Sequence, residues 1–458
     1  MQFIPFLVMI AATPLACFLV PQNPNLGGMR LPAVMLAIGI LAKPCLDATR
    51  RGLRALYSID TVLCLSIVYF HLLELIEGLY PLEVSREAVI GAFLMIATFR
   101  CAILLGLSMN AWRLPRAVTS LASRRYSSRG LFCILTIFFC LGVFNYAFNS
   151  NFSLQTFETN LLSPRFEATW SRGALGGWDA FTDNMTYFGY LLPTWTVLLA
   201  RQLKRWLDPR VILGWLYSII FLACVTQGGG RRLLGVIIGS AILMYMLTAG
   251  KHWLRTGVIS ILSAGLLLGG LELVLQNRNR GYGDFSYHEV SAVNIDDNFL
   301  RVSQVYEIFP DHVPYTGLQA VIYAVVRPVP RIFWENKPVD MGFDLAKYLG
   351  FEGVGFTMSI VGEAYMSWGF SGVFLVGLFL GKLIKMWQAL DQSKTLSSFA
   401  LYSLGCMAMF SGVRSIVELI LMSYPILFWV VSDKVMRLLF RNKKDVVAKP
   451  RFVVLPGV

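Results

Sequence analysis

Long apolar runs alternate with short polar connections along most of the chain. The runs are about 17–25 residues long, the length that crosses roughly 30 Å of hydrocarbon. The second run is expected to end early, because Lys43-Pro44 combines a charge with a helix breaker. The pattern predicts an all-α polytopic membrane protein with about twelve transmembrane helices, at residues 2–20, 30–46, 58–79, 87–108, 130–149, 185–201, 209–226, 232–249, 255–275, 356–381, 396–411 and 415–436.

Composition supports a membrane protein and argues against several other classes of protein and site. The 458 residues are 56% hydrophobic and 15% charged, whereas an average soluble domain is about 25% charged. The formal charge of +13 comes from basic residues that punctuate the apolar runs, so nucleic acid is not an expected partner. None of the eight cysteines has CxxC spacing, which argues against a disulfide framework or a zinc site. The first run lacks a basic n-region and an A-x-A-like site, so we expect a retained helix.

The distribution of lysine and arginine predicts the orientation. Every connection after an even-numbered span is basic, and so is the tail at 437–458. By the positive-inside rule, both termini are then cytoplasmic. The loops at 150–184 and 276–355 would lie on the external side of the membrane, which we call periplasmic. The second of them separates spans 1–9 (within residues 1–275) from spans 10–12 (residues 356–436).

The large periplasmic loop is the one long polar stretch. Its seven basic and ten acidic residues give a net charge of −3, so the positive-inside rule does not explain its arginines. Connections longer than about 12–15 residues are usually functional or disordered, and the aromatic and proline content of this one favours order. A short apolar run at 318–326 predicts an interfacial or re-entrant helix.

Two short periplasmic turns carry arginine next to glycine. One contains Arg231 and Arg232 after three glycines, and the other contains Arg414 after Gly412. Glycine lets the backbone approach a ligand, helix N-termini offer free N–H groups, and guanidinium binds phosphate oxygens bidentately. The alternative is that these side chains extend to lipid headgroups. We favour an anion site, which the loop can extend through Arg278, Arg280, Arg327 and Arg331, although ion pairs within the loop are an equal alternative for these four.

Carboxylates near the periplasmic ends of spans are further candidates. Glu363 lies early in span 10, where it could act as a general base on a hydroxyl or pair with a structural arginine. Glu418 lies four residues after Arg414, a spacing that predicts a contact on one helix face. Structural pairing is the favoured interpretation for the group His71, Glu74 and Glu77. Arg100 has no partner that the sequence identifies, and His288 and His312 are more often solvated than catalytic.

These motifs together resemble the bacterial O-antigen polymerases of the Wzy type, which are oligosaccharide repeat-unit polymerases. The resemblance covers most of residues 185–436 and rests on four short motifs. They are Gly229-Gly230-Arg231-Arg232, Arg327-Pro-Val-Pro-Arg331 with Trp334 and Lys337-Pro338, Gly362-Glu363-Ala364-Tyr365 with Trp368-Gly369, and Gly412-Val413-Arg414.

The resemblance implies a fold like that of the membrane glycosyltransferases of the GT-C class and a role in O-antigen or exopolysaccharide synthesis. A growing glycan on undecaprenyl pyrophosphate would move to the sugar hydroxyl of one lipid-linked repeat unit, with no cofactor or metal. Membrane lipids and a chain-length regulator are the further partners expected. The resemblance places the reaction at the periplasmic face of a bacterial inner membrane and implies pyrophosphate contacts for Arg231, Arg232 and Arg414, and next for Arg327 and Arg331. Together with the residues themselves, it leads us to expect catalytic roles for Glu363, Arg231 and Arg414. The expected contacts with pyrophosphate or glycan are Arg232, Arg278, Arg280, Arg327, Arg331, Trp334, Lys337 and Tyr365.

Two alternatives remain open. An O-antigen ligase uses the same lipid-pyrophosphate chemistry, but the motif around its loop histidine has no counterpart here. A lipid-linked-oligosaccharide flippase or another secondary transporter also suits twelve spans. Such transporters generally consist of two similar halves, whereas only the second half of this chain carries a large loop.

Overall fold

The protein is described here from a computed structural model. The structure describes residues 3–25, 27–78, 82–164, 167–171, 178–227, 231–249, 257–259, 262–263, 265–266, 269–270, 272–273, 276, 296–326, 329, 334, 336–338, 340–352 and 355–439. For residues 53, 171, 178–181, 231 and 439 it describes the backbone alone. The described residues form helices and no strand, which confirms the all-α class.

Seven helical stretches of the described chain are long and apolar enough to cross a membrane. This finding is compatible with a multi-pass membrane protein, while the count of twelve stays a prediction. The seven are α2 (Arg30–Arg51), the continuous stretch of α3 (Ile59–Ile67), η2 (Val68–Leu72) and α4 (Leu73–Glu77), α5 (Arg86–Ser108), α7 (Ser128–Asn149), α11 (Pro209–Gln227), α17 (Ser359–Gln392), and the stretch of α19 (Ile416–Leu421) and α20 (Tyr424–Leu439).

Shorter helices complete the described fold. Three of them are apolar and 16 or 17 residues long, namely α1 (Phe3–Phe18), α12 (Arg231–Leu247) and α18 (Leu396–Gly412). The others are η1 (Leu53–Tyr57), α6 (Arg116–Ala122), α8 (Leu154–Leu162), η3 (Thr169–Ser171), α9 (Trp178–Gly189), α10 (Leu192–Leu203), α14 (Asn298–Ile308), α15 (Gln319–Val326) and α16 (Leu345–Tyr348).

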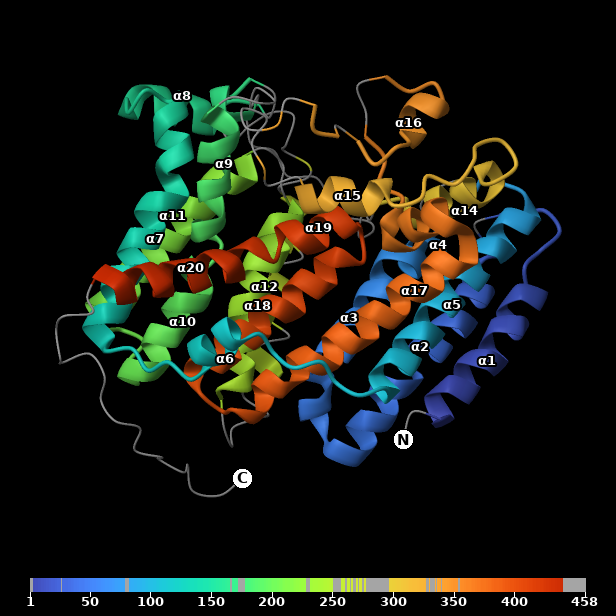
Figure 1. The fold of residues 1–458 in the computed structure, drawn as a ribbon, viewed down its shortest axis with the longest axis horizontal. Helices are drawn as coiled ribbons and strands as arrows, with labels where there is room; N and C mark the ends of the chain where they lie inside the picture. The colour runs from blue at the N-terminus through green and yellow to red at the C-terminus, as the bar shows by residue number, and fades with distance from the viewer. Residues whose placement is uncertain are drawn as a thin grey trace.

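The bundle has two distinct ends in Figure 1. Helices α8, α14, α15 and α16 lie at the end drawn uppermost, which we call the upper end. Helix α6 lies at the opposite, lower end, together with the last turns of α17 and the start of α18. The predicted periplasmic loop therefore coincides with the upper end in its described part, although the structure itself assigns no side of a membrane.

Part of the predicted loop is an integral part of the core. Helix α14 buries Phe299, Val302 and Val305 completely and packs against α5 and α17. Its Tyr306 ring lies so close to Gly91 of α5 that a Cβ there would approach within 2.5 Å. The short helix predicted at 318–326 is confirmed as α15, which lies across the upper end beside α19. The described part of the loop is therefore packed into the helix bundle, although its polar sequence suggests a separate segment.

The prediction that Lys43-Pro44 ends the second span is wrong. Helix α2 continues through Pro44 to Arg51. Proline removes one intrahelical hydrogen bond, a loss that packing can offset. The lysine itself is neutralised, because its Nζ lies 2.6 Å from Asp47 Oδ2 and 3.0 Å from Asp60 Oδ2.

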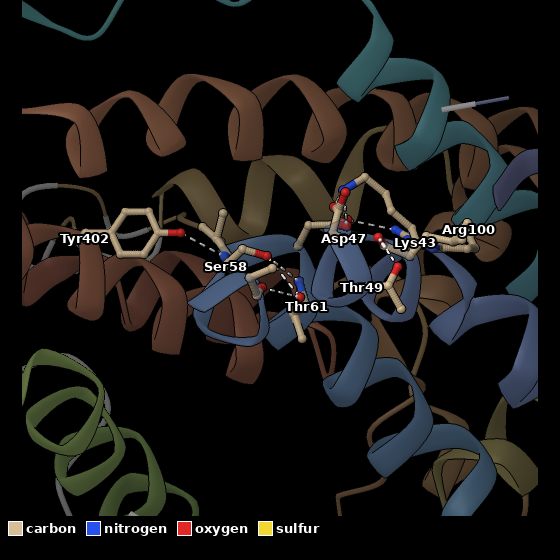
Figure 2. A network of polar contacts seen from close by, with 11 residues as sticks. Lys43, Asp47, Thr49, Ser58, Thr61, Arg100 and Tyr402 are labelled. Carbon is tan, nitrogen blue, oxygen red and sulfur yellow. Dashed lines mark hydrogen bonds and ion pairs between the residues drawn. The ribbon is translucent and has the colours of Figure 1, made fainter. Parts of the chain in front are cut away.

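Those contacts belong to a network of four charged residues that we call the lower cluster: Lys43, Asp47, Asp60 and Arg100. Arg100, which had no partner at the level of sequence, places Nη1 2.9 Å from Asp60 Oδ1. Figure 2 shows Lys43, Asp47 and Arg100 gathered beside the start of α3. Two cations face two anions, so the lower cluster joins α2, α3 and α5 without a net charge.

Glycines bring α5 and α17 into close contact. A Cβ on Gly381 would lie 2.3 Å from the carbonyl oxygen of Ile103, and one on Gly106 would lie 2.4 Å from that of Leu378. Gly377 and Gly381 form a GxxxG pattern, the spacing that lets transmembrane helices approach closely. This contact fixes α17, which carries Glu363, against the helix that carries Arg100.

Helix α17 is broken near its upper end. Trp368 and Gly369 have non-helical backbone angles, and the φ of +61° at Gly369 favours glycine. The segment between α14 and α15 binds the carbonyls beside the break. Thr316 N donates to Met366 O at 3.0 Å, and Gly317 N donates to Ser367 O at 3.1 Å.

Candidate functional site

The turn between α18 and α19 holds Arg414 at the upper end. Helix α18 ends at Gly412, where a Cβ would lie 2.8 Å from Leu419, so a larger residue would disturb the turn. Ser415 then caps α19, with its hydroxyl accepting a hydrogen bond from Val417 N at 3.1 Å. Val413 O accepts one from Ile360 N of α17 at 3.0 Å. These contacts hold the backbone on both sides of Arg414.

The two predicted arginine turns meet in space. Arg232, in the first turn of α12, forms an ion pair through Nη1 with Glu418 Oε1. Arg414 Nη1 lies 3.8 Å from the same oxygen, which confirms the predicted contact between Arg414 and Glu418. Arg414 Nε also donates to Asp296 Oδ2 at 2.6 Å. We call Arg232, Arg414, Glu418 and Asp296 the upper cluster.

The upper cluster is partly open to solvent. The Arg232 side chain is 37% exposed, against 14% for the side chains of Arg414 and Glu418. Each guanidinium carries five N–H donors, more than one carboxylate can satisfy. The Arg232 guanidinium can therefore receive an anion from outside. A phosphate oxygen could also compete with the shared Glu418 carboxylate, because both bind guanidinium in the same geometry.

Glu363 lies directly behind this cluster. Its side chain is fully buried, and Oε2 accepts a hydrogen bond from Ile416 N at 2.7 Å. The carboxylate thus holds the first turn of α19, two residues from Arg414. This contact gives Glu363 a positioning role. Its role as a general base on the substrate stays a prediction, and complete burial keeps it from touching a ligand in this conformation.

The other predicted contact residues are more dispersed. Tyr365 is 4% exposed, and its hydroxyl donates to Phe309 O at 3.4 Å within a group of aromatic rings. Its surroundings fit packing better than glycan binding. Trp334 is 42% exposed, and Lys337 Nζ donates to Val329 O at 2.8 Å. Outside the described residues lie the Arg231 side chain and the whole of Arg278, Arg280, His288, Arg327 and Arg331.

Sequence reasoning missed the part played by two carboxylates, one in the upper cluster and one beside it. Asp296 binds Arg414 from a position 118 residues away in the chain. Glu74 Oε1 accepts a hydrogen bond from Leu300 N at 3.0 Å, so it holds the first turn of α14 just after Asp296. Glu74 was expected to take part in structural pairing, but its partner is a backbone amide. No local spacing links these residues, because each partner belongs to a distant segment.

Among the described residues, no group of three His, Cys, Asp or Glu side chains is placed to hold a metal ion. The upper cluster itself consists of two guanidinium groups and two carboxylates.

Comparison with known proteins gives one partial match. A family described as "Domain of unknown function (DUF8712)" matches residues 297–418, about a quarter of the chain. The matched segment begins directly after Asp296 and ends at Glu418, so it contains Glu363 and Arg414 but not Arg232. No curated protein and no solved structure matched the sequence.

Proposed function

We propose that this protein is a glycosyltransferase that polymerises oligosaccharide repeat units carried on a lipid pyrophosphate. The observation that supports the proposal most directly is the meeting of Arg232 and Arg414 at one carboxylate, Glu418. Two arginines from separate turns at one end of an apolar bundle provide a site for a pyrophosphate whose lipid tail lies in the membrane. The resemblance of these turns to those of O-antigen polymerases adds the reaction.

The chemistry follows from where charge develops. The acceptor hydroxyl oxygen forms a bond to the anomeric carbon of the growing glycan, and the bond from that carbon to the pyrophosphate oxygen breaks. The departing lipid pyrophosphate keeps the electron pair and gains negative charge. Guanidinium groups stabilise this charge, because they are fixed donors aimed at the leaving group before the reaction begins.

The site residues take different roles in this scheme. Arg232 is the exposed contact for the pyrophosphate, and Arg414 is the buried one. Glu418 and Asp296 hold the two arginine side chains in place until the substrate binds. Glu363 positions Arg414 through the first turn of α19. The exposed Trp334 ring at 42% fits a wall for the sugar chain.

The proposal can be tested with purified protein in vesicles that contain lipid-linked repeat units. Wild-type protein should give a ladder of long glycans. Arg232→Ala and Arg414→Ala should each lower the rate of chain extension by roughly 10–100-fold, the effect of losing one charge-assisted hydrogen bond of about 1.5–3 kcal/mol. Arg210→Ala is the matched control, since Arg210 lies at the start of α11 and pairs with the neighbouring Asp208.

A deletion strain separates the alternatives. Surface polysaccharide that carries a single repeat unit would support a polymerase. Loss of every unit would instead indicate a ligase or a flippase. Normal chain length with both arginine variants, at normal protein levels, would disprove the pyrophosphate site.

A further inference from the structure

Several buried polar atoms near the upper cluster have no hydrogen-bond partner within the described structure. They are His71 Nε2, Glu74 Oε2, Glu363 Oε1, and both Nδ2 and Oδ1 of Asn298. His71, Asn298 and Glu363 are 0% exposed, and Glu74 is 2% exposed. Such atoms are costly to bury without a partner, so their presence in one region points to a ligand, water or a proton.

The chain connectivity brings these residues together. Glu74 binds Leu300 N, two residues after Asn298. Asp296, two residues before Asn298, binds Arg414. Glu363 in turn accepts a hydrogen bond from Ile416 N, two residues after Arg414. Helix α14 also packs against both η2 and α17. The first turn of α14 thus lies between the helix of Glu74 and the helix of Glu363.

The backbone at His71 is irregular as well. His71 lies in η2, a π-helical turn inside an otherwise α-helical span. Such turns are rare and occur frequently at functional sites. The ring binds Ile67 O through Nδ1 at 3.1 Å, which leaves Nε2 for a second partner. Glu74 follows one turn later along the same stretch.

We infer that His71, Glu74, Asn298 and Glu363 line one enclosed polar chamber beside the upper cluster. This inference rests on the proposed function, and it assigns the chamber a role in the reaction. We propose that Glu74, assisted by His71, takes up the proton that the acceptor sugar hydroxyl loses. The O–H bond breaks as the new C–O bond forms, and the proton passes to Glu74 Oε2 through enclosed water. A water needs two to four polar partners, and the orphaned atoms supply them.

The groups that face Glu74 are compatible with proton uptake. Asp297 and Arg301 of α14 pair with each other close by, so they add little net charge. The buried residues in the upper half of α2, which packs on α4 and η2, are apolar: Pro32, Ala33, Leu36, Ala37, Gly39 and Ile40. On α17, which packs against α14, the buried titratable group at this end is Glu363.

The structural and chemical roles of Glu74 can be separated, because they use different oxygens. Oε1 accepts a hydrogen bond from Leu300 N, and Oε2 has no hydrogen-bond partner among the residues that the structure describes. The variant Glu74→Gln keeps an amide oxygen for Leu300 N but cannot take up a proton. The exposed Glu83, on the connection that follows α4, provides the matched control Glu83→Gln.

The test measures polymerisation by the full-length protein in vesicles as a function of pH. General-base assistance typically contributes about 10²–10⁴-fold. We therefore expect Glu74→Gln to lower the rate by roughly 10²-fold or more and to abolish the rise of rate with pH. Binding of inorganic pyrophosphate and thermal unfolding should remain unchanged. His71→Asn should shift the pH profile by a smaller amount, and Glu83→Gln should behave like the wild type.

Two outcomes of this assay would overturn the inference. Wild-type rate and pH profile in Glu74→Gln would exclude proton uptake there. So would lower protein stability with an unchanged rate per folded molecule, which indicates a structural role alone. If the wild-type protein does not polymerise at all, the proposed function fails first. Infrared spectra then test the chamber independently of activity. If Glu74 takes up a proton there, a carboxylic-acid band that titrates with pH is present in the wild type and absent from Glu74→Gln.

Discussion

The lower cluster and the upper cluster each combine two basic and two acidic side chains, yet they are suited to different tasks. In the lower cluster the side chains of Asp60 and Arg100 are 1% and 0% exposed. In the upper cluster the side chains of Arg232 and Asp296 are 37% and 26% exposed. The centre of the lower cluster is closed to solvent, although Asp47 at its edge is 23% exposed, whereas a cation of the upper cluster, Arg232, is open to solvent. Exposure, more than residue type, separates a structural ion pair from a ligand site.

The comparison also concerns what surrounds each cluster. The lower one joins three helices and ends at the fully buried Arg100. The upper one lies next to His71, Asn298 and Glu363, which have buried polar atoms without a hydrogen-bond partner in the described part of the chain. Arg100 Nε and Nη2 of the lower cluster also lack such a partner there, so the contrast between the two clusters rests on their exposure. The predictions below test this contrast, beginning with the largest expected effect.

Removal of the central carboxylate of the lower cluster should have the largest effect. Asp60→Asn leaves Arg100 buried without a counter-ion. Breaking a buried pair in this way costs about 3–5 kcal/mol. We expect a large fall in the thermal unfolding temperature of the protein in detergent and a lower yield of folded protein. Unchanged unfolding would show that Arg100 is solvated, which would remove the contrast between the clusters.

The packing of α5 on α17 should be the next most sensitive feature. In Gly381→Ala the new Cβ would meet the carbonyl oxygen of Ile103, 2.3 Å away. Overpacking of this kind costs typically about 1–3 kcal/mol. Thermal unfolding measures the loss. Gly355→Ala is the control, because nothing lies within 4 Å of a Cβ at that position. Equal stability of the two variants would contradict close packing between α5 and α17.

A change at the upper cluster should alter binding more than stability. Glu418→Gln removes the carboxylate that Arg232 and Arg414 share. Competition from this anion then ceases, and we expect inorganic pyrophosphate to bind about tenfold more tightly, a gain of about 1.4 kcal/mol. Calorimetric titration measures the change. Glu352→Gln, at an exposed position, is the control.

The opposite result for Glu418→Gln is equally informative. Weaker binding would mean that Glu418 orients the arginines and does not compete with the ligand. The upper cluster would then resemble the lower one, with a carboxylate that is needed to hold its cations.

The smallest effect belongs to an exposed pair at the lower end. Arg54 Nη2 lies 3.3 Å from Asp391 Oδ1, and both side chains are more than 40% exposed. Surface pairs of this kind contribute about 0–1 kcal/mol. Arg54→Ala should therefore leave thermal unfolding almost unchanged. A loss as large as that in Asp60→Asn would show that exposure does not rank these pairs.

The sequence predicted the helices well and their long-range contacts poorly. Apolar runs of membrane length mark most helices, because hydrophobic length is a local property. The contact between Arg414 and Glu418 was also predictable, since it depends on a spacing of four residues. The end of α2 was misjudged, because the charge of Lys43 is neutralised by Asp47 and by the distant Asp60, and Pro44 is buried inside the continuing helix. A helix breaker is only as disruptive as its tertiary surroundings allow.

The pair of Asp60 and Arg100 carried a signal that could have been used. Arg100 is the one basic residue inside its predicted span, and Asp60 is an acidic residue of the preceding predicted span; opposite charges inside apolar spans usually pair within a bundle. Asp296 and Glu74 offered no comparable signal. Asp296 lies in a polar segment with many acidic residues, and the partner of Glu74 is a backbone amide that no side-chain pattern reveals. The contacts of Asp296 and Glu74 could therefore be found only from the three-dimensional structure.

The break in α17 divides one long helix between two environments. Residues 370–392 still extend about 35 Å at 1.5 Å per residue, enough to cross a bilayer alone. Residues 359–367 are joined to the α14–α15 connection through Thr316 and Gly317. The part of α17 that can cross a membrane and the part that belongs to the candidate site are thus different parts of one helix. The lower part alone is long enough to span a bilayer, so the upper part is available to position Glu363.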